Sequence, residues 1–282
     1  MPFFSAEVID TIIDAIPEED KATIKACSLV CRSWRPRSHF RLLTTISLMS
    51  YPENMTADAV RRRGEEFAKL AKDSDTLKTT LRRLVVPHFV SLEHFPFTNL
   101  TTLLLYTQRC WREALIVIKV ANESPDPESQ HLISFLRKNP HIRQLAIDAF
   151  QMDKKFLFNV FDAIGALKDE PSKLQWLSFD RCVFDLTLPD DAKPHNLKFY
   201  DLGLRLGDNR FFDRFVRAFR INNLHRISIT DLEYQNENKV EAIATLINQH
   251  RKELRRLSLV GLHNLRPEAI CMCPIPCIDS PL

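Results

Sequence analysis

A six-residue pattern of the form L-x-x-L-x-L, in which other apolar residues can replace leucine, recurs eight times along this chain. It reads LTTISL (43–48), LRRLVV (81–86), LTTLLL (100–105), IRQLAI (142–147), LQWLSF (174–179), LKFYDL (197–202), LHRISI (224–229) and LRRLSL (254–259). In most units the last two apolar residues are two positions apart, so they share one face of a β-strand. The pattern therefore predicts eight short strands that each turn one apolar face inward.

Apolar residues at helical spacing lie between these strands. The patterns cover residues near 57–73, 132–136 (ended by Pro140), 156–164, 211–219 and 240–247. A strand followed by a helix, repeated, predicts an α/β fold with a parallel sheet and helices stacked against it. One unit cannot bury its own apolar face, whereas stacked neighbours can, so we favour a solenoid. An ordinary α/β domain with a parallel sheet is the alternative.

Glycine is scarce, with 5 glycines in 282 residues, where average usage of about 7% would give roughly 20. The chain has no GxGxxG, no GxxxxGK[ST] and no GxSxG sequence. Loops that cradle phosphates need glycine for close backbone approach. We therefore expect neither a nucleotide-binding protein nor a serine hydrolase, and no enzyme or cofactor. Gly203 and Gly261 are expected at turns that follow strands.

The charge balance and the cysteines indicate a protein of the cytoplasm or nucleus. The net charge of +3 is too small to indicate a nucleic-acid partner. The seven cysteines are odd in number, so we expect reduced thiols. The N-terminus lacks the basic region of a signal peptide, and the longest apolar stretch, 156–167, is too short to span a membrane. Three further thiols, Cys271, Cys273 and Cys277, could bind a metal only with a further ligand such as His263, and we expect no metal site.

The first fifty residues predict two amphipathic helices. The apolar residues Val8, Ile9, Ile12, Ile13 and Ile16 form one helical stripe after a candidate N-cap, Ser5. A second helix is expected from residue 21 until Pro36 ends it. Its apolar residues lie on two sides, with Ile24, Cys27, Cys31 and Trp34 on one and Leu29 and Val30 on the other. Such a helix is either sandwiched or meets a partner.

These helices resemble an F-box. The run CSLVCRSWRPRSHFRLL (27–43) is similar to the signature L-V-C-[KR]-x-W of the family's second helix, and AEVI (6–9) with Ile12 and Ile13 is similar to the first helix. The nearest match in style is the F-box proteins of mushroom-forming fungi. The family usually opens with Leu-Pro, where this chain has Phe4-Ser5. A small helical hairpin packed on the rest of the protein is the alternative.

The F-box resemblance implies that the helices bind a Skp-family adaptor and, through it, a cullin. The residues expected at the adaptor are Phe4, Val8, Ile12, Leu29, Val30 and Trp34. The remainder resembles an irregular leucine-rich-repeat array of the kind that follows many F-boxes, although the asparagine that often follows each repeat strand is mostly missing. The two resemblances together imply the substrate-recognition subunit of a Skp–cullin–F-box ubiquitin ligase. A ligase-independent repeat scaffold is the alternative.

Strand alternation predicts which side chains of the repeats point away from the core, toward an unknown target protein. The candidates for target binding are Tyr106, Asp148, Trp176, Asp180, Phe199, Asp201, Arg226 and Arg256. The expected domains are an F-box over 1–43, repeats over 44–262 and a tail over 263–282 that is disordered or truncated. The first repeat strand overlaps the end of the F-box.

Overall fold

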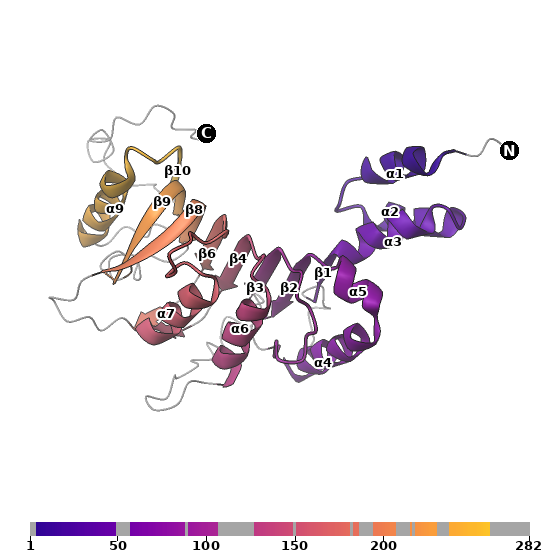
Figure 1. The fold of residues 1–282 in the computed structure, drawn as a ribbon, viewed down its shortest axis with the longest axis horizontal. Helices are drawn as coiled ribbons and strands as arrows, with labels where there is room; N and C mark the ends of the chain where they lie inside the picture. The colour runs from indigo at the N-terminus through magenta and orange to yellow at the C-terminus, as the bar shows by residue number, and fades with distance from the viewer. Residues whose placement is uncertain are drawn as a thin grey trace.

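The computed structural model describes residues 4–48, 57–87, 90–106, 127–148, 151–180, 183–185, 194–206, 215, 218–229 and 237–259. Within these residues the protein is α/β, with three helices first and then a parallel sheet with helices along it (Figure 1). Of the expected 211–219 helix, residues 215 and 218 are helical, and only the end is wrong, because Phe219 is the first residue of a strand.

Three helices, rather than the two expected, form the N-terminal region. They are α1 (Ala6–Asp14), α2 (Lys21–Val30) and α3 (Arg35–Thr44). The Ser5 hydroxyl accepts a hydrogen bond from the backbone N–H of Val8, which confirms Ser5 as the N-cap. Pro36 does not end the second helix but lies in the first turn of α3, where its missing N–H costs no hydrogen bond and its fixed φ suits a helix.

The main sheet has eight strands, and every neighbouring pair is parallel. Its spatial order is β1 (Thr45–Ser47), β2 (Arg83–Pro87), β3 (Thr102–Tyr106), β4 (Gln144–Asp148), β6 (Trp176–Asp180), β8 (His195–Leu206), β9 (Phe219–Ile229) and β10 (Arg256–Leu259). This order is the chain order, so each unit adds one strand beside the previous one. A small second sheet pairs β5 (Gln151–Asp153) with β7 (Val183–Asp185).

The helices cover one face of the main sheet. They are α4 (Ala57–Asp73), α5 (Asp75–Thr80), α6 (Pro127–Lys138), α7 (Lys154–Ala163) and α9 (Glu237–His250), and α4, α6 and α7 lie along the same side of the strands (Figure 1). Six register positions of the sheet point to the helices and are fully or almost fully buried: Leu84, Leu103, Leu145, Leu177, Leu204 and Ile227. The core therefore lies between the sheet and these helices.

Backbone hydrogen bonds repeat just before successive strands. The N–H of Thr101 donates to Arg82 O (2.8 Å), the N–H of Arg143 donates to Thr101 O (2.7 Å) and the N–H of Gln175 donates to Arg143 O (2.7 Å). These bonds link the residue before each strand to the residue before the next strand, with the same offset from one unit to the next. Equivalent turns thus stack, although the spacing of the units along the chain varies.

The sixth strand does not follow the register that the sequence pattern predicts. In β8, Leu204 is the partner of Leu177 on β6, so the segment 201–206 occupies the place expected for 197–202. The strand also contains a register shift against β9 between Lys198 and Leu202. Such an irregularity exchanges the faces on which alternate residues point, so side chains on the two sides of the shift follow different parities.

Candidate functional site

The N-terminal helices have a small core of their own. Ile9, Ile13 and Cys27 are buried together, and Ile16 and Trp34 pack against them. This cluster is separate from the core beneath the sheet. The helices therefore hold their mutual arrangement with apolar contacts that do not involve the strands.

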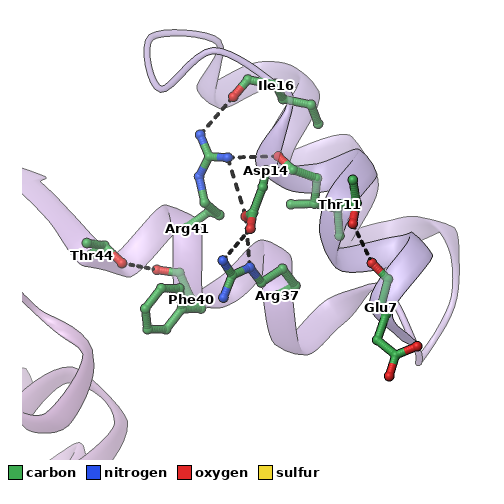
Figure 2. Close-up of polar contacts among 9 residues, drawn as sticks. Glu7, Thr11, Asp14, Ile16, Arg37, Phe40, Arg41 and Thr44 are labelled. Carbon is green, nitrogen blue, oxygen red and sulfur yellow. Dashed lines mark hydrogen bonds and ion pairs between the residues drawn. The ribbon is translucent and has the colours of Figure 1, made fainter. Parts of the chain in front are cut away.

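Two arginines of α3 fix α1 in place (Figure 2). Arg37 forms a two-pronged ion pair with Asp14, in which its Nε donates to Oδ1 at 2.8 Å and its second nitrogen donates to Oδ2. The hydrogen bond from Arg37 lowers the pKa of Asp14 below its ordinary value, against a smaller opposing effect of burial. The acidic C-terminal end of α1 is thereby tied to α3 through a paired and oriented charge.

Arg41 binds the carbonyl groups at the C-terminal end of α1. Its guanidinium donates to the carbonyl oxygens of Ile13 and Ile16, each at 2.8 Å (Figure 2). The last carbonyls of a helix have no partner within the helix, and a cation there also meets the negative end of the helix dipole. The segment RPRSHFRLL thus contains residues with a structural role, Arg37 and Arg41, which join α3 to α1.

Exposed apolar side chains remain on these helices after the small core is satisfied. Phe4, Val8 and Ile12 are exposed. Val8 and Ile12 lie four residues apart on one stripe of α1, and Phe4 comes directly before the N-cap Ser5. Leu29 and Val30 are the last residues of α2 and are 75% and 63% exposed. Aliphatic side chains this open gain nothing from the fold itself. Five of the six residues expected at the adaptor are therefore accessible on the surface.

The sixth residue, Trp34, has a different environment. It lies directly before α3 as its N-cap residue and packs partly against the small core. Phe40 is an exposed aromatic residue that the sequence analysis missed, and the Arg37 guanidinium lies 5.0 Å from the centre of its ring. Pro36 at the start of α3 is the sequence signal that could have identified this helix and Phe40 on it.

The face of the sheet opposite the helices carries several of the residues expected to bind a target. Trp176, Gly203, Arg226 and Arg256 are register partners on β6, β8, β9 and β10. Trp176 is half-buried, because its ring lies over Gly203, and a Cβ at position 203 would be 2.3 Å from its Cε3 atom. Gly203 is therefore inside a strand beneath an indole ring, and its expected place at a turn is wrong. Arg226 and Arg256 are exposed.

Phe199 is not on this face, and its expected role in target binding is wrong. It is fully buried in the main core, because it precedes the irregularity in β8 and so points opposite to the parity predicted for it. Asp201 is half-buried and its Oδ1 is 3.0 Å from Nδ1 of His225. Asp201 thus has a partner within the fold.

The remaining candidates are placed only by their backbone. Tyr106 is the last residue of β3, and Asp148 and Asp180 are register partners at the ends of β4 and β6; their side chains lie outside the described part of the chain. Along the middle of the same face, Leu104, Ala146 and Ser178 are buried. The middle of this face is therefore covered, whereas Arg226 and Arg256 in its C-terminal half are open.

The cysteines support no metal site within the described residues. No group of three or more His, Cys, Asp or Glu side chains there could hold a metal ion. Cys27 is buried and Cys31 is exposed, and a contact of 3.0 Å with the Ser33 hydroxyl lowers the pKa of the Cys31 thiol. The expectation for Cys271, Cys273, Cys277 and His263 falls outside the described residues.

None of the described helices combines the length and the apolar character needed to cross a lipid bilayer. No known family model matches the sequence, and a search of curated proteins finds no similar sequence.

Proposed function

We propose that this protein is the substrate-recognition subunit of a Skp–cullin–F-box ubiquitin ligase. In this proposal the N-terminal helices are an F-box that docks the Skp-family adaptor, and the strand–helix units are a leucine-rich-repeat solenoid that holds a target protein. The protein does no covalent chemistry itself. It raises the effective concentration of target lysines near the ubiquitin-charged enzyme.

The observation that carries the proposal is the exposed pair Leu29 and Val30. Both belong to the LVCRSW sequence that resembles the F-box signature, and both are open on a group of helices that already has its own core. Apolar residues that the fold leaves open in this way mark interaction surfaces. The staggered parallel strands, each added beside the last, support the repeat part of the proposal.

The test is binding of the full-length protein to a purified Skp-family adaptor, measured by biolayer interferometry. The matched variants are Leu29→Asp and Leu70→Asp. Leu70 on α4 is the control because its exposed fraction, 65%, is similar to the 75% of Leu29. Burial of one leucine contributes about 2–3 kcal/mol, so Leu29→Asp should weaken binding on the order of 30- to 150-fold. Leu70→Asp should bind as the wild type does.

No binding by the wild type, or equal loss in both variants, would refute the adaptor-docking part. Adaptor binding that recruits no cullin would instead favour the ligase-independent scaffold.

A further inference from the structure

Three exposed arginines gather on the open half of the sheet. Arg226 and Arg256 are register partners on β9 and β10, and Arg205 on β8 is the register partner of Ser228, two residues after Arg226. All three are exposed. Their strand neighbours Leu204 and Ile227 are buried on the helix side, so the three guanidinium groups point to the same, uncovered side.

None of the ion pairs between described residues involves Arg205, Arg226 or Arg256. The nearby carboxylate of Asp201 is directed to His225 instead. Arg226 and Arg256 lie directly opposite each other on neighbouring strands about 4.8 Å apart, and Arg205 lies two residues further along β8, so these like charges repel one another. An external anion would relieve that repulsion.

Trp176 borders the arginines. Its ring lies on Gly203, and Gly203 is the register partner of Arg226. The surface therefore joins a flat apolar wall to a row of planar cations. Guanidinium groups bind carboxylates through two parallel hydrogen bonds, and aromatic residues and arginines dominate the energetics of protein interfaces.

We propose that this surface, formed by Trp176, Arg205, Arg226 and Arg256, binds an acidic, extended segment of the target protein. The inference rests on the proposed function, because it gives the chemical class of the target that the repeat face would hold. Charge complementarity carries it, since alternate residues of an extended segment lie about 6.6–6.8 Å apart and their carboxylates come within reach of arginines on neighbouring strands.

A nucleic acid fits this surface less well. Three cations would neutralise about three phosphates, whereas proteins that bind nucleic acids well make roughly six to ten such contacts. A short acidic segment needs only the basic part.

The experiment measures fluorescence anisotropy of a labelled ten-residue peptide that alternates Glu with Ser, added to the full-length protein. The probes for comparison are the same peptide with Gln in place of Glu and a ten-nucleotide single-stranded RNA. The test variant is Arg205→Gln/Arg226→Gln/Arg256→Gln. The control, Arg62→Gln/Lys69→Gln/Lys72→Gln, removes the same charge from exposed positions of α4.

We expect the Glu peptide to bind the wild type and the α4 control equally, and the sheet variant about tenfold or more weakly. The Gln peptide should bind none of them, and added salt should weaken the Glu peptide. Absence of Glu-peptide binding, equal loss in both triple variants, or tighter binding of the RNA would each overturn the proposal. Leu29→Asp should bind the peptide as the wild type does, so failure of adaptor docking and failure of this inference are distinguishable.

Discussion

Truncation of Asn139 should destabilise the protein, because this buried side chain makes three hydrogen bonds to the backbone. Asn139 follows α6 and is buried. Its Nδ2 donates to the carbonyl oxygens of Phe97 (2.9 Å) and Phe135 (3.0 Å), and its Oδ1 accepts from the N–H of Leu100 (3.2 Å). One side chain thus ties the end of α6 to the loop that enters β3.

The substitution Asn139→Ala leaves three backbone groups without their side-chain partner. A buried polar group without a hydrogen bond costs about 1–3 kcal/mol, so three such groups at the low end give about 3 kcal/mol. For a chain of this size that loss lowers Tm by roughly 6–12 °C. Urea denaturation followed by far-ultraviolet circular dichroism measures the change in the free energy of unfolding.

Two variants make this measurement decisive. Asn99→Ala removes an exposed amide one residue from Leu100 and should change stability by less than about 0.5 kcal/mol. Asn139→Asp keeps an oxygen for Leu100 but turns a carboxylate toward two carbonyls, so its stability relative to the wild type should improve as acid protonates the new carboxyl. A loss below about 1 kcal/mol for Asn139→Ala, or a loss equal to that of Asn99→Ala, would refute the reasoning.

Three other predictions concern packing and pH. Gly203→Ala should lower the free energy of unfolding by about 1–2 kcal/mol, because the new Cβ displaces the Trp176 ring. In urea titrations the same change should cost much less in a Trp176→Ala background. Equal losses in the two backgrounds would contradict the contact. The pKa of Asp14 is lowered from 3.8, chiefly by the hydrogen bond from Arg37, so its contribution to stability is present above pH 3.8 and is lost as pH falls through the lower folded pKa. Asp14→Asn should therefore flatten the acid limb of a Tm-against-pH curve, and an unchanged limb would count against the ion pair. Burial lowers the pKa of His250 from 6.5, and its Nε2 is buried without a partner among the described residues. The contribution of neutral His250 to the free energy of unfolding should thus be complete above pH 6.5 and should fall as the pH drops toward the folded pKa. His250→Gln should remove this dependence of stability on pH. A dependence that persists in this variant would contradict the prediction.

The repeated hexad placed most of the strands because it combines two constraints. The first apolar residue of a unit enters the core before the strand, and the next two follow at strand spacing, as Leu81, Leu84 and Val86 do. The sixth unit failed because Leu197, Tyr200 and Leu202 satisfy the same spacing by coincidence. Pairing with β6 decides the register there, and no local pattern contains that information.

The candidate site was predictable where a residue's neighbours lie close in sequence. The stripe of Val8 and Ile12 on α1 follows from helical spacing alone. The clamp of Asp14 by Arg37 and Arg41 does not, because it joins residues more than 20 positions apart across a turn that the sequence analysis missed. Likewise, the need for glycine at position 203 comes from a ring on the adjacent strand.

The two proposed surfaces differ in how strongly exposure argues for function. On α1 the core is complete with Ile9 and Ile13, so Val8 and Ile12 on the outside serve no packing need. On the sheet, one side of each strand packs against the helices, and the other side is buried at Leu104, Ala146 and Ser178 but exposed at the arginines. A large apolar residue such as Phe199 can point to either face of its strand, so its place in the sequence does not show that it contacts a partner. Exposed arginines, by contrast, cannot be explained by burial in the core. The apolar residues of α1 and α2 and the arginines of β8, β9 and β10 therefore carry the functional argument, because both sets are exposed and packing among the described residues does not account for them.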